Sequence, residues 1–139
     1  MSPVCNYCAN NEELNKIMLY FADMEVSKAY LFRDQSYYGR CVLAFKEHKR
    51  EFFDLTESEA EAFARDLKRL SGAVSKAVFA DKINIGFFGD KVSHMHCHIV
   101  PKKEGKRSFG GMFEMSCDPP LYLSEAENEN IINKIKENL

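Results

Sequence analysis

Residues 93–101 read SHMHCHIVP, and the alternation in this stretch decides how the chain folds there. Three of the four histidines lie in it, at every second position. In an extended strand successive side chains point to opposite faces, so the histidines would share one face while Met95, Cys97 and Ile99 enter the core. On a helix neighbouring histidines would lie about 200° apart and could not act together. The β-branched pair Ile99-Val100 favours the strand, and we expect Pro101 to end its ladder.

Three imidazoles on one strand face predict a functional site at His94, His96 and His98. The alternative is a solvated polar face, although such a face would more naturally carry threonine, lysine or glutamate. Two chemistries fit: chelation of a metal ion, and nucleophilic catalysis by a neutral imidazole. Because the ordinary pKa of histidine is about 6.5, a lone pair is available at pH 7. A phosphorus centre suits this nucleophile, because a phosphohistidine is labile to water and two easier steps replace one.

Composition and charge limit the function classes. The 139 residues suffice for one domain with a single core, which we expect to span 1–139. A formal net charge of −2 argues against a general binder of nucleic-acid polymers. No apolar run approaches the ~20 residues of a membrane-spanning helix, and the N-terminus lacks the build of a secretory signal. Five cysteines, an odd number, then predict reduced thiols and a cytoplasmic location.

Apolar spacing and helix caps outline an α+β fold. Apolar residues at helical spacing predict a short helix over 10–22. Capping boxes at 56–59 and 124–127 predict the starts of a long helix of about five turns and of a final helix. β-branched, aromatic and continuous apolar runs predict further strands, the first two joined as a hairpin by a turn at 35–39. These strands are expected over 29–34, 40–46 and 83–88.

Three further features carry possible chemistry. Cys5 and Cys8 form a CxxC pair; no strand precedes it, as a redox pair would require, so metal binding is the better functional interpretation. Asp34 ends the first predicted strand, where it could accept hydrogen bonds from ribose hydroxyls or simply initiate a turn. The turn at 89–93, which includes Val92 and Ser93, could aim backbone N–H groups at an anion.

The histidine stretch and the turn before it resemble a known signature. The pattern Gly89-Asp90-x-Val92-x-His94-φ-His96-φ-His98-φ-φ-Pro101 is similar to that of the histidine triad (HIT) superfamily of nucleotide hydrolases and transferases. The resemblance covers most of residues 5–139, and the tail is similar to a bacterial-type branch that resembles diadenosine polyphosphate hydrolases. Matching segments outside the triad are Phe32-x-Asp34, Tyr38-Gly39-x-x-Val42-Leu43, His48, Asp54-Leu55-Thr56-x-x-Glu59, Phe109-Gly110-Gly111 and Tyr122-Leu123-Ser124.

The resemblance implies a fold and an assembly. It implies a HIT-like α+β fold with an antiparallel sheet of about five strands. One long central helix would pack on the sheet, with short N-terminal and C-terminal helices in addition. The family often pairs as a homodimer, so a second copy is an expected partner.

The resemblance also implies a reaction. His96 would attack the α-phosphorus of a nucleotide and form a nucleotidyl-histidine, which water cleaves to a nucleoside monophosphate. His98 would contact the phosphate or the leaving-group oxygen, and His94 would orient the strand. The expected substrate is a dinucleoside polyphosphate or a nucleoside phosphoramidate. The alternatives are a non-catalytic zinc- and nucleotide-binding sensor and a nucleotidyltransferase.

Substrate-binding residues follow from the same resemblance. Asp34 matches the position that binds ribose, and Leu31 or Phe32 would support the base. Better-known branches carry Gly-Gln-(Ser/Thr) before the triad, whereas this chain has Gly89-Asp90-Lys91. We therefore expect Lys91 to replace the lost phosphate contacts, because an aspartate facing a phosphate is repulsive.

A structural zinc ion is the one cofactor that the resemblance implies. Cys5, Cys8, His48 and His94 match, in order, a ligand set found in some family members and related uridylyltransferases. Together they would form a Cys₂His₂ tetrahedron. The alternative is a pair of surface thiols, with His94 bound only to backbone. No organic cofactor is expected.

Overall fold

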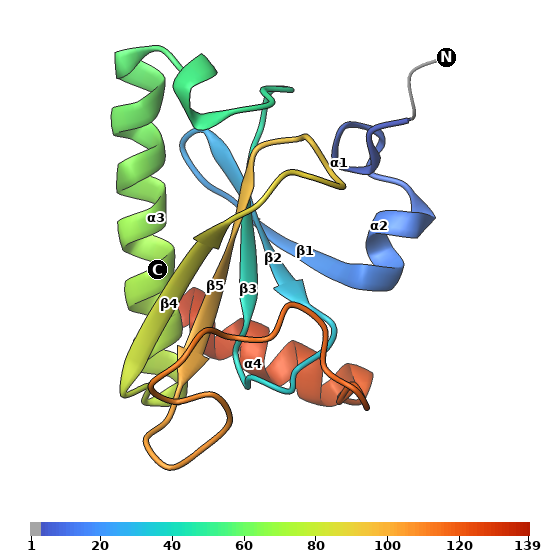
Figure 1. The fold of residues 1–139 in the computed structure, drawn as a ribbon, viewed down its shortest axis with the longest axis vertical. Coiled ribbons are helices and arrows are strands. Elements are labelled where there is room, and N and C mark those ends of the chain that lie inside the picture. The colour runs from blue at the N-terminus through green and yellow to red at the C-terminus, as the bar shows by residue number, and fades with distance from the viewer. Residues whose placement is uncertain (1–3) are drawn as a thin grey trace.

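The computed structural model describes residues 4–139 and contains one antiparallel sheet with the strand order β1-β2-β3-β5-β4 (Figure 1). The predicted α+β fold, with its five strands and one long helix, is confirmed. No helix in this range is long and apolar enough to cross a membrane. The elements are α1 (Asn6–Ala9), α2 (Glu12–Ile17), β1 (Met18–Asp23), β2 (Ser27–Phe32), β3 (Cys41–Phe45), a 3₁₀ turn (Phe52–Asp54), α3 (Glu57–Val78), β4 (Lys82–Phe87), β5 (His96–Lys102) and α4 (Glu125–Glu137).

The two faces of the sheet are covered differently. Helices α3 and α4 pack on one face and enclose the main core, which includes Phe63, Leu70 and Ile131. On the other face α1 and α2 cover only part of the sheet, over a smaller cluster that contains Tyr7 and Met18. Figure 1 shows α3 at the left, beside β4, and α1 and α2 at the right, beside β1. The histidine face is thus only partly covered.

Both predicted helix starts agree with the structure. The side chain of Thr56 accepts a hydrogen bond from the backbone N–H of Glu59, and the Glu59 carboxylate accepts one from the N–H of Thr56. Ser124 and Glu127 form the same reciprocal pair at the start of α4. Each box satisfies backbone donors that a helix start leaves free.

The predicted helix over 10–22 is wrong in its second half. Helix α2 ends at Ile17, and Met18 begins β1, which pairs with β2. Met18 packs into the cluster on the histidine side, whereas Phe21 packs into the main core. Both faces of β1 therefore bury apolar residues, and a register shift between Tyr20 and Ala22 disturbs the alternation further. The resulting spacing of three residues imitates a helix.

Strand β5 continues past the point where we expected it to end. Pro101 pairs with Ile83 on β4, and the strand runs to Lys102. The Lys102 carbonyl faces β4, where it accepts a hydrogen bond from the N–H of Asp81, so the neighbouring Pro101 nitrogen faces the β3 side. Pairing with β3 has already ended at Ile99, so the missing N–H of proline costs no ladder bond.

Candidate active site and metal centre

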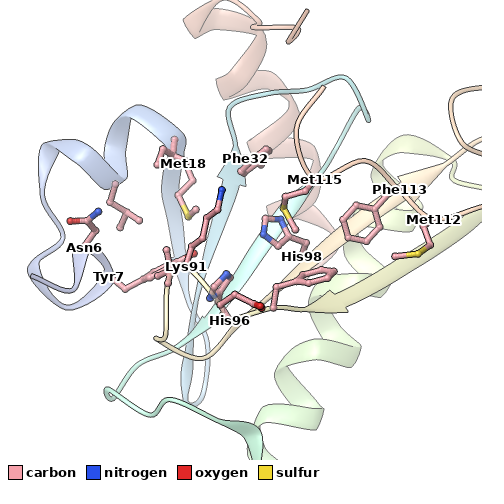
Figure 2. A pocket seen from close by; sticks show the side chains of 16 residues that line it. Asn6, Tyr7, Met18, Phe32, Lys91, His96, His98, Met112, Phe113 and Met115 are labelled. Atoms are coloured by element: carbon pink, nitrogen blue, oxygen red, sulfur yellow. The ribbon is translucent and has the colours of Figure 1, made fainter. Parts of the chain in front are cut away.

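The alternation predicted for residues 93–101 is observed. His96 and His98 lie on the sheet face away from α3, whereas Cys97 and Ile99 lie in the main core. His94 precedes β5 and is buried at one end of the same row. The two strand histidines face a cavity of about 420 Å³, and Figure 2 shows their imidazoles directed into it.

The hydrogen bond of His96 defines which of its nitrogens has a free lone pair. Its Nδ1 lies 2.6 Å from the backbone oxygen of His94, a group that can only accept, so Nδ1 carries the proton. The unprotonated Nε2 is then left for the cavity. Burial lowers the pKa of His96, which favours the neutral ring. The ring of Tyr7 packs against His96 with centroids 5.1 Å apart and restrains its rotation.

His98 has the opposite tautomer. Its Nδ1 lies 3.1 Å from a terminal nitrogen of Arg40, and a guanidinium can only donate. Nδ1 is therefore the acceptor, and the proton of the neutral ring is on Nε2. Burial, and next the positive charge of Arg40, lower the pKa of His98 to about 3. The same face thus holds one free lone pair, on His96, and one N–H donor, on His98.

The cavity around the histidines is mostly apolar. Tyr7 and Met18 form one wall, and Phe113 and Met115, from the segment after β5, form the opposite wall. Such a cavity, with a few convergent polar groups, is typical of a small-molecule site. Sequence reasoning missed these four residues, because they come from elements that meet only in the folded chain.

The predicted substrate-binding residues separate into two groups. Phe32, Lys91 and Val92 line the cavity. Ser93 is exposed and is not part of the cavity lining. Leu31 is fully buried in the main core, on the opposite face of β2, so the prediction that it supports a base is wrong.

Asp34 performs a local structural task. Its Oδ1 accepts hydrogen bonds from the Ser36 hydroxyl (2.6 Å), the Ser36 N–H (3.0 Å) and the Leu121 N–H (3.1 Å). It initiates a turn and fastens the segment that leads to α4, and it does not line the cavity. The turn interpretation therefore describes Asp34, and its predicted contact with ribose stays a prediction.

A second cavity opens on the other side of the β4–β5 loop. It has a volume of about 430 Å³ and is lined by Arg50, Glu51 and Phe52, among others. His96 and residues 88–90 border both cavities. The His96 ring therefore lies where a mostly apolar cavity meets a second cavity that is lined by charged groups.

The four predicted metal ligands converge. The ligand atoms of Cys5, Cys8, His48 and His94 all lie within 4.8 Å of one another. Nδ1 of His94 is 3.4 Å from Sγ of Cys5, 3.5 Å from Sγ of Cys8 and 3.3 Å from Nδ1 of His48. Zinc bonds of about 2.3 Å to sulfur and about 2.0–2.1 Å to nitrogen place tetrahedral ligands roughly 3.3–3.8 Å apart, so the donor set fits that ion.

A backbone contact orients His94 toward this cluster. Its Nε2 lies 2.6 Å from the Phe45 carbonyl oxygen, so Nε2 carries the proton and Nδ1 presents a lone pair to the thiols. Without a shared cation, two imidazole nitrogens 3.3 Å apart would need a proton between them. The four residues are therefore suited to hold a metal ion.

Comparison with known proteins identifies the family. The family model described as the HIT domain matches residues 15–105, more than half of the chain, and the protein belongs to this family. Proteins of the family bind nucleotides and include hydrolases and transferases. No curated protein matches the chain.

Several solved structures share the fold. A histidine triad protein from Bradyrhizobium japonicum is 22% identical, with a TM-score of 0.83 over 92% of this chain and 95% of that one. A hypothetical histidine triad nucleotide-binding protein from Sulfolobus tokodaii is 21% identical, with a TM-score of 0.72 over 96% and 91%. A zinc-bound histidine triad family protein from Mycobacterium smegmatis is 19% identical, with a TM-score of 0.69 over 96% and 94%.

Proposed function

We propose that the protein is a nucleotide hydrolase that acts through a covalent nucleotidyl-histidine on His96. It would cleave a phosphoanhydride or phosphoramidate bond at the α-phosphorus and release a nucleoside monophosphate. One observation carries this proposal: Nδ1 of His96 is bound to a backbone carbonyl, which leaves the Nε2 lone pair for the cavity. Membership of the HIT family supports it.

Two displacements at phosphorus make up the reaction. Nε2 of His96 attacks the α-phosphorus, a P–N bond forms, and the bond to the leaving group breaks with its electron pair on that group. Water then attacks the same phosphorus, the P–N electrons return to His96, and a water proton passes to solvent. The N–H on Nε2 of His98 donates a hydrogen bond to the phosphoryl group during both steps.

The nucleotide would lie with its base among the apolar side chains of the cavity. Tyr7, Met18 and Phe32 offer flat or flexible surfaces for a base. The Lys91 ammonium, on the loop beside His96, would face the phosphates. The charged cavity beyond residues 88–90 would receive the leaving group or an acceptor.

Replacing the nucleophile tests hydrolysis directly. We expect His96→Ala to lower kcat for diadenosine tetraphosphate by at least about 1,000-fold, because the covalent route is lost. Nucleotide binding, measured by calorimetry, should stay within about threefold, because the cavity walls are unchanged. An exposed-residue control, Lys68→Ala on α3, should keep both values.

The outcome also separates the alternatives. A wild-type protein that binds the nucleotide without releasing AMP would contradict hydrolysis and support a sensor protein. The charged cavity beside His96 is what favours the second candidate, a nucleotidyltransferase. In that case a nucleotidylated phosphate acceptor, rather than AMP, would accumulate when the acceptor is added.

We also propose that the Cys₂His₂ cluster holds structural zinc. The metal would supply a rigid cross-link between α1 and the start of β5, and it would leave His96 free. The donor geometry supports this assignment, and a zinc-bound histidine triad protein shares the fold.

Metal content tests the zinc site. The wild-type protein should bind about one zinc per chain by atomic emission, and Cys8→Ser should lose most of it, because one of four ligands is gone. The matched control is Cys117→Ser, whose thiol lies on the same sheet face but far from the cluster. Full zinc content in Cys8→Ser, or none in the wild type, would contradict the proposal.

We further propose that the chain pairs with a second copy along β4. This strand is at one end of the sheet, and its Ile85 and Phe87 side chains are 43% and 44% exposed. An open apolar edge favours pairing with another strand.

Ile85→Lys should convert a dimer to a monomer in sedimentation velocity, because it places a charge on this edge. Tyr122→Lys, at an exposed residue outside β4, should not change the assembly. A wild-type protein that is a monomer would refute the pairing.

A further inference from the structure

Arg40 is buried directly behind His98. Its side chain is fully excluded from solvent and does not line the cavity. One terminal nitrogen lies 3.1 Å from Nδ1 of His98, and the other donates to the Glu114 carbonyl at 3.2 Å. The guanidinium carbon is 4.2 Å from the ring centre of Phe32 and 5.3 Å from that of Phe113. Arg40 thus reaches the reaction centre only through His98.

Among residues 4–139, the positive charge of Arg40 has no ion-pair partner. None of the salt bridges formed within residues 4–139 includes it, and its Nε has no hydrogen-bond partner there. The surrounding groups that titrate are Cys117, Asp34 and Tyr37, and none forms a salt bridge with the guanidinium. Burial lowers the pKa of Arg40 to about 10, which leaves it charged at neutral pH. An unpaired buried cation costs stability, so a role in function would explain it.

The guanidinium constrains the protonation of His98. A guanidinium has five donors and no acceptor, so Nδ1 of His98 must accept as long as the contact persists. A proton on Nδ1 of His98 would leave two N–H donors facing each other, and the resulting imidazolium would lie against the positive charge of Arg40. The rings packed on His98 are those of Phe32, Phe88, Phe113 and His96. The charged residues that line the same cavity are Asp90 and Lys91, which are neighbours of opposite charge and are exposed.

We propose that Arg40 is a positioning residue that keeps His98 a neutral hydrogen-bond donor and so selects substrates whose leaving group departs as an anion. The class that meets this requirement is the nucleoside polyphosphates, in preference to phosphoramidates. The selection rests on the proposed function, whereas the state of His98 does not.

The bond changes explain the selection. When His96 attacks a phosphoanhydride, the P–O bond breaks and the oxygen keeps the electron pair as a phosphate anion, which needs no proton. When it attacks a phosphoramidate, the P–N bond breaks and the departing nitrogen must gain a proton. A neutral His98 could supply that proton only by becoming an imidazolate, so His98 does not act as the acid for this substrate.

The state of His98 is tested first, without substrate. In long-range ¹H–¹⁵N spectra between pH 5 and 8, the wild type should show Nδ1 unprotonated and Nε2 protonated throughout. In Arg40→Met the pKa of His98 should rise, so that a second proton is taken up toward the acid end of this range, because the opposing cation and donor are gone and burial, the larger cause, remains. Arg40→Gln offers a neutral donor and should keep the tautomer while the pKa rises. Arg69→Met removes an exposed arginine on α3 and should match the wild type.

Substrate preference is tested next, by kcat/KM at pH 6. The wild type should prefer diadenosine tetraphosphate to adenosine 5′-phosphoramidate, and Arg40→Met should shift this ratio toward the phosphoramidate by about 100-fold, the typical gain from a general acid. Arg69→Met should keep the ratio. Melting curves check that each variant is folded. If Arg40→Met does not fold, Arg40→Gln takes its place in the comparison.

Each contrary result contradicts a different claim. A His98 whose tautomer and pKa are unchanged in both Arg40→Met and Arg40→Gln overturns the positioning role. An unchanged substrate ratio with a charged His98 overturns the selection. Absence of turnover with every nucleotide in the wild type overturns the selection together with hydrolysis, and the spectra still decide the role of Arg40.

Discussion

The hydrogen bond between Nδ1 of His96 and the backbone carbonyl of His94 links the two proposed sites of this protein, the histidine cavity and the Cys/His cluster. His94 is held at both ends of its ring, by the Phe45 carbonyl on β3 and by the Cys/His cluster. Its backbone therefore has little freedom, and the His96 ring that it orients keeps one nitrogen, Nε2, without a partner in residues 4–139. The Tyr7 ring packs on both histidines, and Tyr7 lies on α1 between Cys5 and Cys8, so α1 contributes to the same restraint.

Two neighbouring histidines on one strand have opposite tautomers because their partners differ. A backbone oxygen can only accept, so His96 keeps its proton on Nδ1; a guanidinium can only donate, so His98 keeps its proton on Nε2. Burial lowers the pKa of both rings and keeps them neutral. The result is a free imidazole lone pair beside a hydrogen-bond donor, on one strand and at the border of two cavities.

Local patterns predicted much of this arrangement, and the misses have common causes. Period-two alternation placed the histidines on one face, and capping residues placed the starts of α3 and α4. The pattern failed for β1, where both strand faces are buried. Leu31 lies in a continuous apolar run, in which sequence does not show which face meets the cavity. Arg40 follows a turn glycine, and nothing local indicates that its charge is buried against His98.

The central claim is that a covalent bond forms on Nε2 of His96. The most direct measurement is the intact mass of the protein after brief mixing with diadenosine tetraphosphate, with an alkaline quench that spares the acid-labile P–N bond. The account predicts an adenylyl adduct that fragmentation assigns to His96, that decays as AMP appears, and that is absent in His96→Gly. AMP release at an undiminished rate by His96→Gly, or an adduct on another residue, would contradict it.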